Sequence, residues 1–153
     1  MVETKEIKLE PIGYVRRKAK DENVRDRSLA VQVVIKPKYL KALNGVEDYS
    51  HLFIIFYMHK IPKKQEPILK VHPRGRADIP LQGIFATHTP QRPNPIGLTL
   101  VQLIERKKNI LVVKGLDAYD NTPVLDIKPY NHWDSLADIK VPEWLKKLEE
   151  TSS

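Results

Sequence analysis

The chain has 153 residues, of which 41% are hydrophobic, so it can bury one core and is too short for two ordinary domains to be expected. It contains no cysteine, which excludes disulfides, thiolate metal sites and a cysteine nucleophile. The 26 Lys and Arg residues exceed the 19 Asp and Glu residues, and the formal net charge of +7 is compatible with a polyanionic partner such as RNA without establishing one.

Short apolar stretches separated by turn residues recur along the chain, and this spacing predicts an antiparallel sheet or barrel. Within Val31–Ile35 and Leu98–Ile104 aliphatic residues alternate with others, which is the period of a strand with one buried face. The segment His51–His59 is apolar on both sides, which predicts a central strand. The stretches are Ile7–Val15, Leu29–Ile35, Leu52–His59, Pro67–Val71, Gly83–Thr87, Leu98–Glu105, Ile110–Leu116 and Pro123–Ile127.

Two segments are predicted to be helical. Lys36–Asn44 has an apolar side and ends at Asn44-Gly45, a plausible helix stop. Pro142–Glu150 has proline at the first helical position and an apolar stripe. The expected structure is therefore mainly β: a single domain over residues 1–153 with an antiparallel barrel-like core at about 7–132 and one or two short peripheral helices.

Nothing in the sequence predicts a membrane segment or a secretory signal. The longest apolar run, Leu52–Met58, has seven residues, whereas a membrane span needs about 20. The N-terminus carries charged residues from Glu3 to Lys8 and lacks an apolar segment followed by small residues. A cytoplasmic protein is therefore expected.

A loop rich in proline follows the stretch at Gly83–Thr87. Three prolines, at positions 90, 93 and 95, fix the backbone and remove hydrogen-bond donors, which predicts a rigid exposed loop. Arg92 lies among these prolines, where its guanidinium could bind a carboxylate or phosphate through two hydrogen bonds. The alternative is a stiff connection whose arginine makes a surface ion pair.

A second polar cluster extends from Leu116 to Tyr130. Asp120-Asn121 followed by Pro123 marks a turn. Asp126 then lies between apolar neighbours, where its carboxylate is expected to be partly buried. It either accepts backbone hydrogen bonds or pairs with an arginine, or it holds a cationic ligand group or accepts a proton.

The histidines and glycines narrow the chemistry further. His59, at the end of the central strand, and His88, in the proline loop, are candidate general bases. The five histidines lack metal-motif spacing, so no metal site is expected. The six glycines do not match a dinucleotide-binding or P-loop pattern.

Two basic segments stand out, and each has two interpretations. One is the turn His72–Arg76, and the other is Arg16–Lys20 together with Arg25 and Arg27. Both could contact phosphates, or both could be solvated charged loops.

Several strings of residues resemble the TsaA-like family, which includes the TrmO tRNA methyltransferases, and they occur in the order expected of that family. The resemblance covers roughly residues 7–132. The strings are Ile12–Arg16, Ser50–Phe56, His72–Arg74, Gly83–Thr87, Arg92–Leu98 and Asp126–Tyr130.

This resemblance implies a barrel-like β fold that forms a homodimer and binds S-adenosylmethionine without a Rossmann domain. It also implies methylation of the exocyclic nitrogen of threonylcarbamoyladenosine beside the anticodon of tRNA. By the family's motifs, the cofactor-binding residues are Arg27, Ser28, Leu29, His59, Lys60, His88, Leu98, Asp117, Ala118, Tyr119 and Asp120. At His88 the sequence departs from the family, which carries arginine after Phe-Ala-Thr.

Arg92 and Asp126 are the predicted catalytic residues, building and stiffening the site, with Asp126 or a histidine assisting proton loss. The alternatives are a methyltransferase of another substrate and a non-catalytic module that binds S-adenosylmethionine or RNA. A hydrolase is disfavoured because the sequence has no Ser/His/Asp elbow and no closely spaced metal ligands.

Overall fold

The computed structural model describes residues 6–151, and the chain separates into two compact units. The first unit comprises Met1–Lys60 and Ile96–Asn131, and the second comprises Ile61–Pro95 and His132–Ser153. Each unit is described by itself. The ends of the expected domain, residues 1–5 and 152–153, lie outside the described residues, and a single domain over residues 1–153 stays a prediction.

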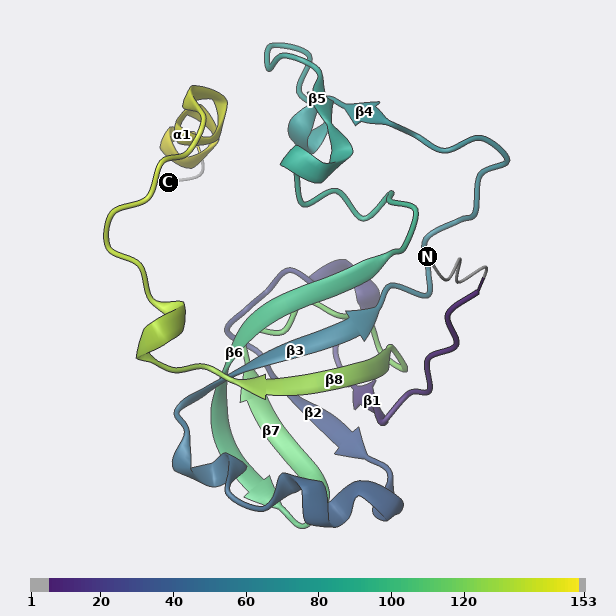
Figure 1. The fold of residues 1–153 in the computed structure, drawn as a ribbon, viewed down its shortest axis with the longest axis vertical. Coiled ribbons are helices and arrows are strands. Elements are labelled where there is room, and N and C mark those ends of the chain that lie inside the picture. The colour runs from purple at the N-terminus through teal and green to yellow at the C-terminus, as the bar shows by residue number, and fades with distance from the viewer. Residues whose placement is uncertain (1–5, 152–153) are drawn as a thin grey trace, which may run out of the picture. The chain divides into compact units, whose positions relative to one another are not determined.

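The first unit is a closed barrel of six antiparallel strands (Figure 1). Around the barrel the strands follow the order β1-β2-β7-β6-β3-β8, and β8 pairs with β1 to close it. The mainly β, barrel-like fold is therefore confirmed. The strands are β1 (Gly13–Arg16), β2 (Ala30–Ile35), β3 (His51–Tyr57), β6 (Ile96–Lys107), β7 (Ile110–Lys114) and β8 (Pro123–Pro129).

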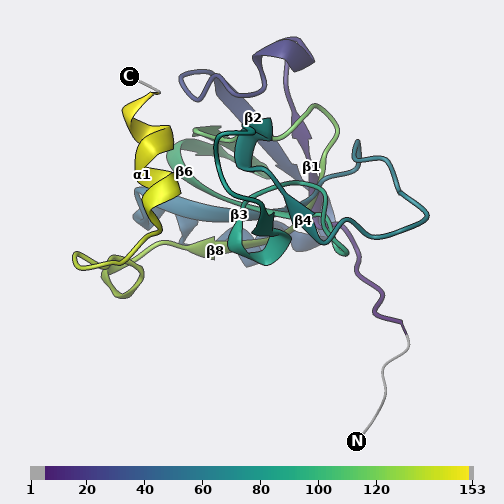
Figure 2. The same ribbon diagram turned by 90° about the horizontal axis from the view of Figure 1, so that it is seen from above.

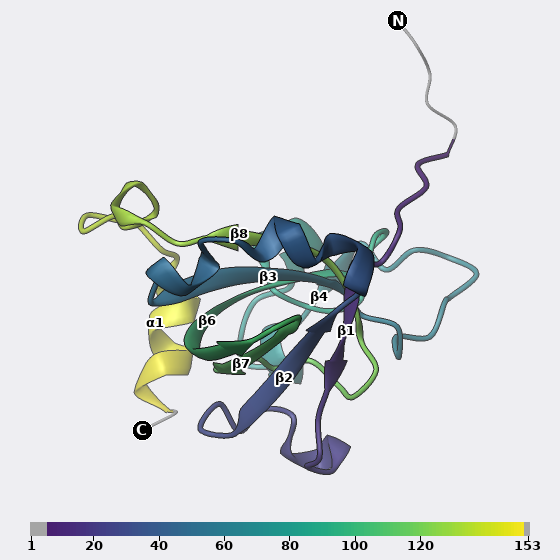
Figure 3. The same cartoon turned by 90° about the horizontal axis from the view of Figure 1, so that it is seen from below.

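The connections leave the barrel at opposite ends. The β1–β2 connection contains the 3₁₀ turn η1 (Asp21–Asn23) and projects from the strands in Figures 2 and 3. At the other end, η2 (Pro37–Leu43) and η3 (Val46–Asp48) run across the barrel (Figure 3). The helix expected at Lys36–Asn44 is thus a 3₁₀ helix.

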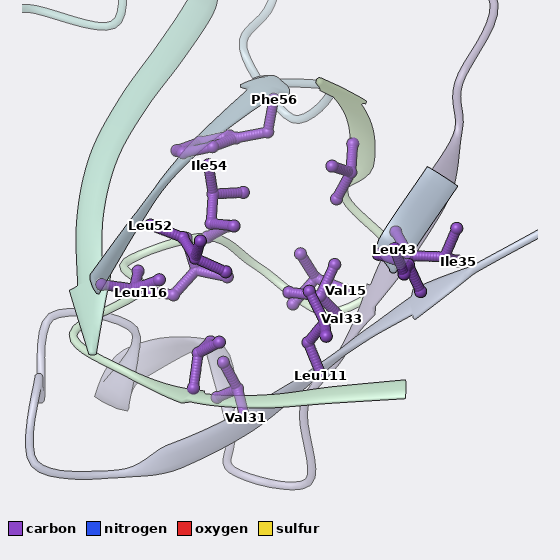
Figure 4. Packing of buried hydrophobic residues seen from close by; sticks show 14 residues of the cluster. Val15, Val31, Val33, Ile35, Leu43, Leu52, Ile54, Phe56, Leu111 and Leu116 are labelled. Atoms are coloured by element: carbon purple, nitrogen blue, oxygen red, sulfur yellow. The ribbon is translucent and has the colours of Figure 1, made fainter. Parts of the chain in front are cut away.

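The barrel interior is filled by aliphatic side chains from alternate strand positions (Figure 4). On β2, the buried residues are Val31, Val33 and Ile35, as the alternation predicts. Strand β3, expected as a central strand, pairs with β6 on one side and β8 on the other, as every strand of a closed barrel has two neighbours. Each fully buried aliphatic side chain contributes about 1.5–3 kcal/mol.

Strand β6 differs from the prediction in which face it buries. Leu98 and Leu100 face outward, with 63% and 40% of their surface exposed, whereas Thr99 and Val101 face the core. Gly97 is buried opposite Phe56 of β3. A Cβ atom at Gly97 would lie 2.9 Å from Cδ2 of Phe56 and closer still to Cε2 and Cζ, so the ring fills the space that a side chain would need.

The second unit contains β4 (Lys70–Val71), β5 (Gln82–Gly83) and α1 (Glu143–Glu150). The helix expected at the C-terminus is confirmed. Within the second unit, Arg76 donates a hydrogen bond to Thr151 Oγ1 at 2.9 Å, and Leu148 of α1 is 3% exposed. Within residues 6–151 no helix is long and apolar enough to cross a membrane.

Three predicted strands are shorter than expected. The structure has no strand at residues 7–12 or 67–69. At Gly83–Thr87 only the glycine belongs to a strand, because the next residues form the 3₁₀ turn η5 (Ile84–Ala86), which Thr87 closes by hydrogen bonds to Ile84 O. Short apolar runs do not distinguish a strand from one turn of helix that buries a single residue, here Ile84.

Candidate functional site

Three connections meet at one end of the barrel, because antiparallel strands place alternate connections at the same end. They are residues 17–29 between β1 and β2, residues 58–60 after β3, and residues 115–122 between β7 and β8. We call this set of three connections the barrel-end loops. They carry nine of the eleven predicted cofactor-binding residues, and the remaining two are Leu98 on β6 and His88 in the second unit.

Asp117 contacts both β6 and the β1–β2 connection. Its Oδ1 accepts a hydrogen bond from the Thr99 hydroxyl at 2.6 Å, which holds the carboxylate against β6. Its Oδ2 lies 3.6 Å from Nη2 of Arg27, whose side chain is 66% exposed. The structure therefore brings together two predicted residues of opposite charge. Their long ion pair leaves both groups able to bind a ligand.

Lys60 connects the other two loops. Its ammonium forms an ion pair with Asp21 of η1 and lies 4.9 Å from the centre of the Tyr119 ring. A cation over an aromatic face is attracted by the ring quadrupole. Lys60 therefore joins residues 17–29 to residues 115–122, and two more predicted residues, Lys60 and Tyr119, are neighbours.

The buried Arg17 fastens the same loops from inside, and the sequence analysis did not single it out. Only 5% of Arg17 is exposed. Its guanidinium donates hydrogen bonds to Leu116 O at 3.1 Å, Asn23 O at 2.9 Å and Val24 O at 3.3 Å. Its Nε is buried and has no hydrogen-bond partner among the described residues.

The backbone of Arg17 continues this connection, because its N–H donates to Asp120 Oδ1 at 2.7 Å. Asp120, another predicted residue, is therefore already committed to loop structure through one oxygen. The phosphate contact considered for the basic segment does not apply to Arg17, since its guanidinium is buried and bound to carbonyl groups.

Ser28 and Leu29 belong to a tight turn around Asp26. The Ser28 hydroxyl donates to Asp26 Oδ1 at 2.6 Å and its N–H donates to the same oxygen at 3.0 Å. These two hydrogen bonds, the hydroxyl first, lower the pKa of Asp26 below its ordinary value. Leu29 donates its N–H to Asp26 O at 3.4 Å and is half-buried.

The remaining predicted barrel residues lie in different environments. His59 is exposed directly after β3. Ala118 is 2% exposed and its side chain packs in the core, which leaves its backbone for a ligand. Leu98 lies on the outer face of β6, opposite Ile55 of β3.

Asp126 is exposed, so the expectation of a partly buried carboxylate is wrong. Its Oδ1 accepts the N–H of Ile127 at 2.8 Å, and its Oδ2 lies 3.8 Å from Lys128 Nζ. The apolar neighbours do not bury it because successive strand residues face opposite sides. Asp126 pairs with Ile55, which also pairs with Leu98, so Asp126 and Leu98 are two strand spacings, about 10 Å, apart.

The proline loop belongs to the second unit. The Arg92 guanidinium donates through Nη1 to Thr87 O at 3.0 Å and Thr89 O at 2.9 Å, so it braces its own loop. It makes no ion pair with the residues that the structure describes, which removes the surface ion pair considered above. His88, between the two carbonyl-bearing threonines, is exposed.

The basic turn at His72–Arg76 is partly committed to local structure. His72 Nδ1 bonds Ile79 O at 2.8 Å, and Arg76 donates through Nε to Asp78 at 3.0 Å. The hydrogen bonds between the two side chains raise the pKa of Arg76 and lower the pKa of Asp78. Across residues 6–151, no three or more His, Asp and Glu side chains are placed to hold a metal ion.

Thr99 and Arg17 are the functional candidates that sequence reasoning missed. A polar residue between Gly97 and Val101, at an inward position of the strand period, could have identified Thr99. Arg17 carries no comparable signal, because it lies in a run of exposed basic residues.

Comparison with known proteins identifies relatives over most of the chain. The family model described as the tRNA-methyltransferase O N-terminal domain matches residues 19–135. A probable S-adenosyl-L-methionine-binding protein of Methanothermobacter thermautotrophicus is 42% identical over 130 residues, covering 82% of this chain and 90% of the relative. A tRNA (adenine(37)-N6)-methyltransferase of Rattus norvegicus is 36% identical over 155 residues, covering 95% of this chain and 34% of the relative.

The barrel also resembles solved structures of TrmO. One crystal structure of TrmO is 30% identical with a TM-score of 0.70, over 88% of this chain and 62% of that chain. TrmO from Pseudomonas aeruginosa is 29% identical with a TM-score of 0.69, over 94% of this chain and 64% of that chain. The chain thus spans less than two thirds of these structures and about a third of the rat enzyme.

Proposed function

The chain belongs to the tRNA-methyltransferase O N-terminal domain family, and from this premise we propose that it binds S-adenosylmethionine and methylates an adenine of tRNA. The proposed acceptor is the exocyclic nitrogen of threonylcarbamoyladenosine beside the anticodon. The observation that carries the proposal is the gathering of Arg27, Asp117, Lys60 and Tyr119 at one end of a barrel of this family.

The chemistry of the barrel-end loops fits the cofactor. S-adenosylmethionine has an ammonium group, a carboxylate, a sulfonium and an adenosine. Asp117 can accept a hydrogen bond from an ammonium or ribose hydroxyl, and the exposed Arg27 can donate to a carboxylate. The Tyr119 ring offers a surface for a base. These side chains lie in the barrel-end loops, so they can make these contacts without a change in the barrel core.

When bound, S-adenosylmethionine supplies a methyl group on a positively charged sulfur. The task of the chain is then to hold the acceptor nitrogen close to that carbon and in line with it, which supplies most of the acceleration in such a reaction. The acceptor nitrogen would give up a proton on taking the methyl group, so the chain would also need a group that accepts this proton. We assign the removal of that proton to Asp126, whose exposed carboxylate lies on the same outer face as Leu98.

Calorimetric titration tests the cofactor site. The parent protein is expected to bind S-adenosylmethionine and its demethylated product saturably, and Asp117→Asn is expected to weaken binding of both by about tenfold or more, since one charge-assisted contact is worth about 1.5–3 kcal/mol. The matched control is Asp48→Asn, which makes the same change to an exposed carboxylate in η3, at the opposite end of the barrel. Equal affinity in all three proteins would place the cofactor elsewhere.

Asp126→Asn tests the proton-transfer role. The methylation rate is expected to fall by about a hundredfold or more with cofactor affinity unchanged, because a positioned base contributes about 10²–10⁴. The control is Glu105→Gln, which removes an exposed strand carboxylate that pairs with Lys107 two residues on, as Asp126 pairs with Lys128. Full turnover by Asp126→Asn would remove Asp126 from the mechanism.

Cofactor binding without methyl transfer is the second candidate function. Relatives that this chain matches over 90% and 88% of their length are named for S-adenosylmethionine binding alone. A homodimer is also proposed, on the family resemblance, and light scattering of the purified protein gives its mass directly.

A further inference from the structure

We propose that the outer rim of residues 17–29 is an RNA-docking surface that holds the sugar-phosphate backbone of the acceptor beside the cofactor site. We call Lys18, Lys20 and Arg25 the rim cations. The proposal deepens the proposed function, on which it rests, by assigning the acceptor to a surface of this chain.

Charge is concentrated on this connection. Residues 16–29 contain six basic and three acidic side chains, so fourteen residues carry +3 of the chain's net charge of +7. The three rim cations are exposed, and none has a carboxylate within 4.0 Å among the residues that the structure describes.

Two of the three acidic side chains of the connection, Asp21 and Asp26, have partners other than the rim cations. Asp21 pairs with Lys60 and Asp26 accepts the two hydrogen bonds from Ser28. The pKa of Asp26 is lowered by those bonds, so it stays anionic without neutralising a rim cation. The two carboxylates therefore build the loop, while the rim cations remain available to a polyanion.

The connection is held in place rather than left free to adapt. The Arg17 guanidinium links Asn23 to Leu116 by donating to both carbonyl groups, and Lys60 links η1 to Tyr119. In Figures 2 and 3 the connection projects from the strands β1 and β2. A projecting loop that is fixed from inside presents its charges in one arrangement, which reduces the entropy lost on binding.

The rim cations lie on the same connection as part of the proposed cofactor site. Arg27, which is proposed to bind the cofactor, lies on the same connection as the rim cations. Asp117, its ion-pair partner, lies on the loop to which Arg17 links that connection. An RNA strand bound along the rim cations would therefore lie next to the methyl donor. Phosphate contacts fix the register of a nucleic acid without reading its sequence, which is the positioning that an in-line transfer needs.

The test compares two triple variants with the same change in net charge. The rim variant carries Lys18→Gln, Lys20→Gln and Arg25→Gln. The control carries Lys41→Gln, Lys107→Gln and Lys108→Gln, which are exposed on η2 and on the β6–β7 turn at the opposite end of the barrel. Each is titrated with a fluorescently labelled tRNA anticodon stem-loop at several salt concentrations, without cofactor.

Three lost phosphate contacts at about 0.7 per contact predict a salt slope shallower by about 2 for the rim variant, and about a hundredfold weaker binding at 0.1 M salt. The control is expected to stay within about threefold of the parent, since only the long-range attraction changes. Equal losses in the two variants, or no loss in the rim variant, would overturn the assignment.

Titration of the same three proteins with S-adenosylmethionine separates this inference from the proposed function. The rim variant is expected to bind the cofactor within about twofold of the parent, because no rim cation takes part in the ion pair of Arg27 with Asp117 or in the hydrogen bond of Thr99 to Asp117. Absence of cofactor binding by the parent would refute the proposed function. Loss of cofactor affinity in the rim variant alone would overturn the inference, by showing that the substitutions disturb the loop itself.

Discussion

Replacing Arg17 by methionine tests whether the buried guanidinium builds the barrel-end loops. Methionine keeps the apolar stem and removes the three donated hydrogen bonds. The bond to Leu116 O is buried, and a buried carbonyl left without a donor costs about 1–3 kcal/mol. The carbonyls of Asn23 and Val24 are only partly buried and can be hydrated. Removal of a buried charge with an unpaired Nε offsets part of this loss.

The expected net destabilisation is about 0.5–2 kcal/mol, which corresponds to a fall in Tm of about 1–8 °C for a chain of this size. The affinity for S-adenosylmethionine should fall as well, because Asp117 directly follows Leu116. Arg16→Met is the matched control, since Arg16 is exposed and, within residues 6–151, its guanidinium donates only to Gln32 Oε1, at 3.5 Å. Equal melting temperatures and equal cofactor affinities for the two variants, measured by calorimetry, would refute the role assigned to Arg17.

Three further predictions concern packing, the hydrogen bond to Asp117 and acid stability. Gly97→Ala forces a methyl group against the Phe56 ring and should cost about 1–3 kcal/mol in denaturant unfolding; Gly97→Ala combined with Phe56→Leu should recover part of this, and additive losses would contradict the clash. Thr99→Val removes the donor to Asp117 and should raise the cofactor dissociation constant with a smaller rise for Thr99→Ser; an unchanged constant in both would show that the carboxylate needs no support. The free energy of unfolding should be constant above about pH 4.5 and fall at lower pH, because carboxylates whose pKa is lowered in the folded state are protonated first in the unfolded chain. A Tm that does not change between pH 5 and pH 3 would contradict this prediction. These carboxylates are Glu10, Asp26, Glu47 and Asp78.

The sequence predicts the barrel well where one physical pattern dominates. In β2 the alternation of valine and isoleucine gives the buried face directly, and in β3 the two-sided apolar run indicates a strand with neighbours on both sides. On β6 the pattern misleads, since Leu98 and Leu100 alternate as regularly as the residues that are buried. Gly97 and Thr99 take the inward positions because Phe56 and Asp117 occupy the space beside them, and such partners are not visible along one strand.

The candidate site shows the same limit. The family's motifs predict that Arg27 and Asp117 bind the cofactor, and the structure shows that the two side chains are paired. What motifs do not convey is burial: Asp126 is exposed although its neighbours in sequence are apolar, and Arg17 is buried although its neighbours are charged. Both outcomes depend on which side of a strand or loop a residue faces, which is determined by long-range pairing.

The most direct test of the account is mass spectrometry of nucleosides from tRNA incubated with the purified protein and S-adenosylmethionine that carries an isotopically labelled methyl group. The account predicts a labelled N6-methylated threonylcarbamoyladenosine that the parent protein forms and that Asp117→Asn forms far more slowly. A protein that binds the cofactor saturably and yields no labelled nucleoside from tRNA bearing threonylcarbamoyladenosine would contradict the methyltransferase assignment and leave a cofactor-binding module in its place.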